Sequence, residues 1–350
     1  MKSLFEPIEI GKLNLRNRVI RSATMESAGD ENGRIKKELA GLYTELARGG
    51  VGAIITGMMA IDENASALQT MIKTYSSAFV EDYRTVAAAV HEYDCKLIVQ
   101  LAHCGVKATQ PFGPSPFPEK KAQGMTMEQI RQIPASFAEA ARRCKEAGAD
   151  GVELHGAHGY LLSQFLSPVF NQRTDKYGGS LENRARILFE VYAAVRRSVG
   201  TDYAVWIKIN GDDRMQGGMS LEESKWVCSE LSKMGIDAIE VSGGVSLGKE
   251  SASTPMNAPD LEGIFAVQAL EIAGDVKTPV ISVGGYRTPE KMTQIINQGV
   301  DAISICRPFI CEPDLLKRWE SDAALKPRCI SCNKCFGPGF VSCKAFSSGS

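Results

Sequence analysis

The sequence lacks the features that would mark a membrane protein, a secreted protein or a nucleic-acid-binding protein. No apolar run reaches the roughly 18 residues that a membrane-spanning helix needs. The first residues contain no apolar segment of signal-peptide length. An excess of one charge is also missing, because 40 basic residues stand against 41 acidic ones and leave a net charge of −1. We therefore expect a cytoplasmic protein with no membrane or nucleic-acid partner, since both partners favour a basic excess.

Histidine and tryptophan are scarce, with four and three residues, whereas the ten cysteines are many. These cysteines do not resemble a disulfide framework, because six stand far apart or in apolar surroundings and the other four cluster near the end. The pattern indicates a reducing compartment. A hydrophobic content of 44% and a charged content of 23% are those of an ordinary globular protein.

Short apolar, β-branched runs recur along the chain, and a helix-like stretch follows each of them. The runs are residues 18–22, 53–58, 96–101, 151–156, 204–210, 238–244, 279–285 and 302–307. Continuous apolar character is typical of parallel strands that are covered on both faces. Eight strands alternating with helices predict an α/β fold of the (β/α)8 TIM barrel type. An open doubly wound sheet is the alternative, because the sequence gives strand order and not closure.

The remaining segments predict extensions of this barrel. We expect the barrel to cover residues 1–316, with residues 1–16 capping its bottom. Residues 106–135 contain five prolines and predict a long loop after the third strand. Residues 317–350 form a short cysteine-rich C-terminal tail. Loops such as 106–135 and 245–262 would build the rim of the substrate pocket.

Three of the four histidines stand where the third and fourth predicted strands end, and barrel enzymes carry their chemistry at that face. His155, His158 and Tyr160 lie within six residues of one another. Two imidazoles can donate hydrogen bonds to one carbonyl oxygen, and a phenol can deliver a proton. The alternatives are structural histidines beside a core tyrosine, or a zinc site. No carboxylate or cysteine at ligand spacing supports zinc.

The ends of the seventh and eighth predicted strands indicate an anion site. Gly284 and Gly285 precede a predicted helix start at residues 288–290, which would expose backbone N–H groups. Cys306 and Arg307 end the next strand, and the loops after these two strands commonly bind phosphate in barrels. A plain glycine turn is the alternative. No GxGxxG follows the first strand, so a Rossmann dinucleotide fold has no support. The phosphate site, the imidazoles and the phenol together indicate a phosphorylated cofactor that faces a carbonyl substrate.

Residues 155–190 resemble the signature of the Old Yellow Enzyme family of FMN-dependent ene-reductases. The segments NRVIRSAT at 17–24 and VQLAH at 99–103 match the family too, as do the ends of the seventh and eighth strands. The matches are colinear over most of the chain. The resemblance implies a (β/α)8 barrel that holds FMN non-covalently at its mouth and takes electrons from NADH or NADPH.

The resemblance also implies roles for individual residues. His155 and His158 match the pair that grips the oxygen of the substrate, and Tyr160 matches the proton donor. Contacts to the cofactor are implied for Ala23, Thr24, Met25, Met58, Gln100, Lys208, Gly284, Gly285, Cys306 and Arg307. Lys208 would stabilise the anionic reduced flavin. Met25 departs from the Thr or Cys of many members, so the flavin potential does not carry over.

The activity implied by the resemblance is reduction of the activated C=C bond of an α,β-unsaturated carbonyl compound. An enone, an enal or a nitro compound would receive a hydride from flavin N5 at the β-carbon and a proton from Tyr160 at the α-carbon. Similar barrels act as amine or N-methyl dehydrogenases, which is one alternative, and an electron carrier that uses the C-terminal cysteines is another. The sequence leaves open the natural substrate, the choice between NADH and NADPH, and the oligomeric state, a homo-oligomer included.

The terminal cysteines have a spacing typical of metal sites: Cys329-x2-Cys332-x2-Cys335-x7-Cys343. In multidomain relatives a cysteine group after the barrel holds a [4Fe–4S] cluster, but the spacing there differs. Zinc is a second interpretation. Four free thiols are the third, and they are favoured because a cluster would have no evident internal electron donor.

Overall fold

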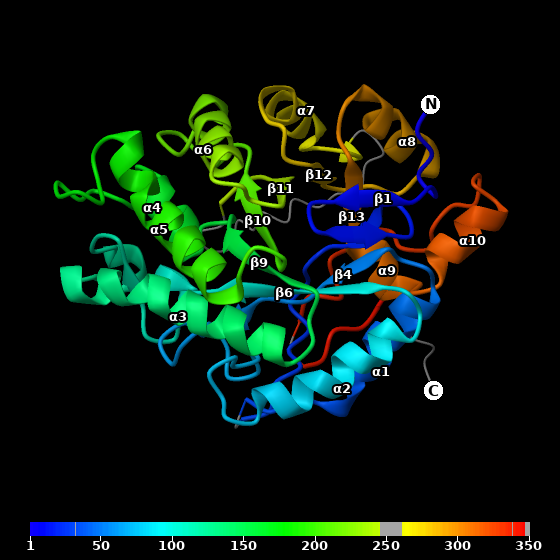
Figure 1. The fold of residues 1–350 in the computed structure, drawn as a ribbon, viewed down its shortest axis with the longest axis horizontal. Coiled ribbons are helices and arrows are strands. Elements are labelled where there is room, and N and C mark those ends of the chain that lie inside the picture. Colours follow the sequence, from blue (N-terminus) through cyan, green and yellow to red (C-terminus); the bar gives the residue numbers. More distant parts are fainter. Residues whose placement is uncertain (32, 246–260, 338, 347–350) are drawn as a thin grey trace.

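The computed structural model describes residues 1–31, 33–245, 261–337 and 339–346, and its centre is a closed ring of parallel strands (Figure 1). The ring consists of β3 (Val19–Arg21), β4 (Ala53–Ile55), β6 (Lys96–Ala102), β9 (Gly151–Gly156), β10 (Ala204–Asn210), β11 (Ala238–Ser242), β12 (Val280–Val283) and β13 (Ala302–Ile305). Each strand pairs in parallel with the next, and β13 pairs with β3 to close the ring. The predicted TIM barrel is confirmed, and the open sheet is wrong.

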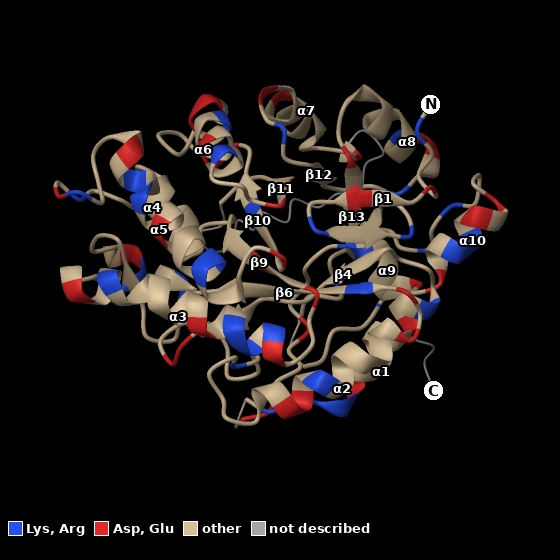
Figure 2. Cartoon of the chain, in the orientation of Figure 1, with Lys and Arg blue, Asp and Glu red and all other residues tan. Residues whose placement is uncertain are grey.

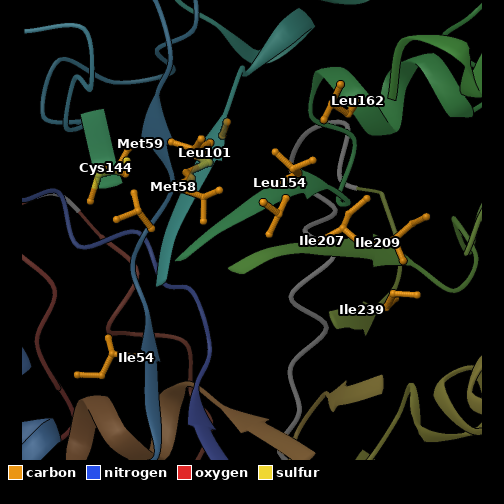
Figure 3. Packing of buried hydrophobic residues seen from close by; sticks show 14 of the residues in the cluster. Ile54, Met58, Met59, Leu101, Cys144, Leu154, Leu162, Ile207, Ile209 and Ile239 are labelled. Atoms are coloured by element: carbon orange, nitrogen blue, oxygen red, sulfur yellow. The ribbon is translucent and has the colours of Figure 1, made fainter. Parts of the chain in front are cut away.

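Helices surround this ring, and charged residues lie along most of them (Figure 2). They are α1 (Lys37–Arg48), α2 (Phe79–His91), α3 (Met127–Glu146), α4 (Leu161–Leu166), α5 (Leu181–Val199), α6 (Leu221–Lys233), α7 (Ala266–Asp275), α8 (Pro289–Gln298), α9 (Arg307–Cys311) and α10 (Leu315–Ser321). Their apolar faces and the outer faces of the strands form one buried cluster. Figure 3 shows part of it, including Leu101 and Leu154 on strands and Cys144 and Leu162 on helices.

The loops after the second and third barrel strands contain short strands and 3-10 helices. The short strand β5 (Met59–Ala60) pairs in parallel with the end of β6. Two further short strands, β7 (Phe112–Gly113) and β8 (Gln123–Gly124), pair with each other. Two 3-10 helices, η1 (Gly105–Lys107) and η2 (Pro118–Lys120), complete this region. None of the helices in the described part of the chain is long and apolar enough to span a membrane.

An N-terminal hairpin fills the bottom of the barrel, as predicted for residues 1–16. It consists of β1 (Ile8–Ile10) and β2 (Leu13–Leu15), which pair antiparallel. Its buried residues Ile10, Leu13 and Leu15 form a second apolar cluster with Trp206 and other residues from the barrel strands. The hairpin therefore covers one end of the barrel, and a functional site would lie at the opposite end.

The predicted loop at 106–135 is wrong in its last part, because α3 begins at Met127. Thr126 and Gln129 form a capping box: the Thr126 hydroxyl accepts from the Gln129 backbone N–H at 3.2 Å, and the Gln129 side chain accepts from the Thr126 N–H at 2.8 Å. Pro134 lies inside the helix. The proline favoured a loop at the sequence level, but the cap and the buried apolar face of α3 outweigh the loss of one backbone hydrogen bond. Of the predicted rim at 245–262, residues 246–260 lie outside the described part of the chain.

We predict that Ile10→Ala destabilises the fold through the bottom of the barrel. Ile10 is completely buried, so truncation should lower the free energy of unfolding by about 2–5 kcal/mol. The neighbouring Glu9→Ala is the control, because Glu9 is exposed and should change that free energy by less than about 0.5 kcal/mol. Urea unfolding monitored by tryptophan fluorescence would measure both. Equal effects of the two substitutions would contradict the role of the hairpin.

Candidate active site

One cavity at the C-terminal face of the barrel collects ten of the predicted site residues. It has a volume of about 470 Å³. Its walls are formed by Ala23, Thr24, Met25, Met58, Gln100, His155, His158, Tyr160, Lys208, Cys306 and Phe336. The other predicted residues, Gly284, Gly285 and Arg307, line a neighbouring cavity of about 470 Å³. Cys306 lines both, so the two cavities adjoin.

The two histidines and the tyrosine face one another across the first cavity. His155 belongs to β9, and His158 and Tyr160 lie in the turn before α4. The ring centroids of His155 and His158 are 5.4 Å apart, and those of His155 and Tyr160 are 4.7 Å apart. The turn is shaped by a left-handed backbone at His158, with φ of 60°, whose N–H donates to the Asn210 side chain at 3.1 Å. The sequence motif therefore folds into a compact group of three rings.

Both histidines are neutral in this environment. Burial lowers the pKa of His158 to about 3, and the nearby positive charges of Lys208 and Lys107 act in the same direction. Burial, with the neighbouring His158, also holds the pKa of His155 well below its usual value. His158 Nε2 lies 2.7 Å from the hydroxyl of Ser242, whereas His155 Nδ1 is buried without a partner among the described residues. Each ring can therefore serve as a neutral hydrogen-bond donor.

Tyr160 is a protonated phenol beside a buried cation. Burial raises the pKa of Tyr160 above its usual value, so its proton is held until an acceptor arrives. Lys107 Nζ lies 4.7 Å from the centroid of the Tyr160 ring and donates to the His158 carbonyl at 2.6 Å. Burial lowers the pKa of Lys107 to about 8. Lys107 was not predicted from the sequence, although it stands only a few residues after the histidine at the end of the third strand. That histidine, His103, is not among the residues that line the cavity, and its Nδ1 accepts a hydrogen bond from the Gly105 N–H at 3.0 Å.

A buried cluster of ionisable side chains lies on the strands that form the cavity wall. Lys208 Nζ is 2.7 Å from Glu240 Oε2, and it donates to the Ser22 hydroxyl at 3.0 Å. Gln100 donates to Glu153 at 2.6 Å. Glu153 and Glu240 were not predicted from the sequence. The available signal was an acidic residue inside an otherwise apolar strand, which buries a charge only if that charge is paired.

The predicted anion site at the ends of the seventh and eighth barrel strands differs from expectation in one respect. The backbone at Gly284 and Gly285 has φ of 132° and 71°, which favours glycine there. The amides at the start of α8, however, are partly occupied, because the N–H groups of Arg287 and Thr288 both donate to Glu262 Oε1 at 2.7 Å. The cationic side chain of Arg307 lines the same cavity. Positive charge at this site therefore comes more from arginine than from the helix end.

The C-terminal tail folds over both cavities. Phe336 lines the first cavity and Ser331 lines the second, and neither was predicted. Arg287 donates to the Ser331 hydroxyl at 2.7 Å, and Arg307 donates to the Asn333 side chain at 2.7 Å. No local sequence pattern marks Phe336, because its role depends on where the tail packs.

The four terminal cysteines come together in the tail. With Cys311 they line a cavity of about 300 Å³, together with Arg307. Among the residues that the structure describes, no group of three or more His, Cys, Asp or Glu side chains is arranged to hold a metal ion. A metal or cluster on Cys329, Cys332, Cys335 and Cys343 therefore stays a prediction from their spacing.

Known proteins resemble this chain over nearly its whole length. A metal reductase from Desulforamulus reducens is 37% identical over 95% of this chain and 51% of its own length. An NADH oxidase from Thermoanaerobacter brockii is 35% identical over 95% and 53%. The chain therefore spans about half the length of these two relatives. An NADPH dehydrogenase from Bacillus cytotoxicus is 34% identical over 89% of this chain and 90% of its own.

Solved structures confirm the predicted resemblance to Old Yellow Enzyme. A 2-naphthoyl-CoA reductase superposes with a TM-score of 0.88 at 26% identity, over 95% of this chain and 54% of that one. An old yellow enzyme homologue from Zymomonas mobilis superposes with a TM-score of 0.80 at 26% identity, over 93% and 94%. The model of the NADH:flavin oxidoreductase / NADH oxidase family matches residues 3–326. The chain therefore belongs to this family, whose cofactors are FMN and NAD(P)H.

Proposed function

We propose that this protein uses FMN and NAD(P)H to reduce the activated C=C bond of an α,β-unsaturated carbonyl compound or a related nitro compound. The observation that carries the proposal is the convergence of two neutral imidazoles and one protonated phenol on a single cavity. A carbonyl oxygen needs hydrogen-bond donors, and the carbon next to it needs an acid. The activities of the metal reductase and the NADH oxidase belong to proteins about twice as long as this chain, so the substrate is argued from the cavity itself.

The residues that line the two cavities fit FMN. Gln100 and Lys208 offer polar groups to a heterocycle in the first cavity, and Arg307 offers a cation to a phosphate in the second. Cys306, which lines both, is 2.8 Å from the Thr24 hydroxyl. Ala23 and Met58 would contribute contacts beside the ring. When bound, FMN supplies a carrier that takes a hydride from NAD(P)H and passes it to a second substrate.

The three rings divide the remaining chemistry between them. His155 and His158 donate hydrogen bonds to the substrate oxygen and stabilise the negative charge that develops there as the β-carbon receives a hydride. Tyr160 gives its phenolic proton to the α-carbon. The Lys107 ammonium, 4.7 Å from the Tyr160 ring centroid, stabilises the phenolate until solvent returns the proton. The histidines bind and polarise, and only Tyr160 changes its protonation state.

Tyr160→Phe should separate the two halves of the reaction. Removing the acid should slow enone reduction by roughly 10²–10⁴-fold, while flavin reduction by NAD(P)H changes little. Stopped-flow absorbance of the flavin would follow each half-reaction separately.

Tyr203→Phe is the matched control for this substitution. Tyr203 is also a buried tyrosine, and its hydroxyl is without a partner among the described side chains. It precedes β10, at the opposite end of that strand from Asn210, so its loss should affect neither half-reaction. If Tyr160→Phe slowed both half-reactions equally, the proton-donor role would be wrong.

The neutral state of the two histidines can be observed directly. Because burial lowers the pKa of His158 to about 3 and that of His155 well below its usual value, both rings should stay neutral from pH 8 to pH 5. The ¹⁵N chemical shifts of the imidazole nitrogens would report this, with His158→Gln providing the assignment. A titration of either ring near pH 6.5 would mean that the substrate oxygen meets a charged donor instead.

A further inference from the structure

Three ionisable side chains lie inside the barrel on neighbouring strands. Glu153 is on β9, Lys208 is on β10, and Glu240 is on β11 directly opposite Lys208 in the strand register. All three are at most 3% exposed to solvent. Burying charges in this way is costly unless they are paired and hydrogen-bonded. Apolar packing therefore does not explain why these three ionisable side chains lie inside the barrel.

Glu240 has polar contacts at both of its carboxylate oxygens. Its Oε2 lies 2.7 Å from Lys208 Nζ, and its Oε1 accepts from the hydroxyl of Ser22 at 2.8 Å and from that of Ser304. Burial alone would raise the pKa of Glu240, but Lys208 and these hydrogen bonds lower it below its usual value. Glu240 also raises the pKa of Lys208 against the effect of burial. Both members of the pair are thus charged.

Glu153 is in the opposite state although it lies close by. Burial raises its pKa well above the usual value, and the negative charge of Glu240 adds to the shift. Glu153 is therefore a neutral acid that accepts from Gln100 at 2.6 Å. Two carboxyl groups in one site thus carry one negative charge between them.

The charge beneath the cofactor cavity is therefore balanced. Lys208 is the one cation among the described residues that line this cavity, and His155 and His158 beside it are neutral. Glu240 is not among the residues that line the cavity, but it pairs directly with Lys208, which does line it. A lysine with a buried carboxylate at 2.7 Å stabilises a new negative charge less than an unpaired lysine would.

We propose that Glu240 is a positioning residue that sets the reduction potential of the flavin, by acting as the counter-ion of Lys208. This inference rests on the proposed binding of FMN in the cavity. Reduction adds negative charge to the flavin, and Glu240 limits how strongly Lys208 compensates for it. Glu153 adds no charge of its own to this balance, because it is a neutral acid.

Glu240→Gln and Glu153→Gln form a matched pair of variants that test the proposal. The same chemical change removes a negative charge in the first and replaces a neutral acid by a neutral amide in the second. The FMN-loaded proteins would be equilibrated without air against a reference redox dye, and the flavin absorbance would give the equilibrium constant for reduction. Glu240→Gln should shift this constant toward reduced flavin by about tenfold or more, and Glu153→Gln by less than about threefold.

Two results would overturn the inference. One is an unchanged equilibrium constant in Glu240→Gln, and the other is an equal shift in both variants, which would indicate a general effect of disturbing the barrel interior. Either result would leave the proposed enzymatic function standing, because flavin would still bind. Failure of the wild-type protein to bind FMN would remove the proposed function and this inference together.

Lys208→Met keeps the test valid if Glu240→Gln does not fold with an unpaired lysine. Without Lys208, the buried Glu240 should take up a proton, so the net charge of the site stays the same. The equilibrium constant should then shift toward oxidised flavin by less than about tenfold. A loss of about a hundredfold or more would show that Lys208 acts as an uncompensated cation, and would contradict the role of Glu240.

Discussion

The closed pairing of the barrel strands is the constraint on which the rest of the structure depends. Because β13 pairs with β3 and β4 pairs with β6, the C-terminal ends of all these strands meet around one opening. Thr24, Gln100, His155, Lys208 and Cys306 are widely separated in the sequence, and they share one cavity for this reason. The N-terminal hairpin covers the other end, so the predicted site residues gather at the end that this hairpin leaves uncovered.

The apolar barrel gives the few polar groups inside it unusual properties. The same burial keeps His158 neutral, keeps Tyr160 protonated and forces Glu153 to hold its proton. Lys208 and Glu240 remain charged because each is the partner of the other. Each side chain thus has the protonation state that the proposed chemistry requires, and that state follows from its surroundings and not from its residue type.

The sequence predicts the strands and the ring cluster well because both depend on local pattern. The eight apolar runs coincide with β3, β4, β6 and β9 to β13, and the motif at 155–160 places its rings together through a single turn. Contacts between distant segments are not visible in this way. Phe336 reaches the cavity because the tail packs over it. Glu262, in the loop before α7, accepts hydrogen bonds from N–H groups at the start of α8. Glu240 left a signal, a charge within an apolar strand. The meaning of that signal depended on Lys208, which lies on the preceding barrel strand with α6 between them in the chain.

In the proposed function, the mouth of this barrel holds a flavin that moves hydride from NAD(P)H to an activated C=C bond. The most direct test is the absorption spectrum of the purified protein without air, recorded alone, after NADH or NADPH, and after 2-cyclohexenone. We expect flavin absorbance near ~450 nm that bleaches with the nicotinamide and returns with the enone. A colourless protein that gains no absorbance with added FMN would contradict it, as would a reduced flavin that the enone fails to reoxidise.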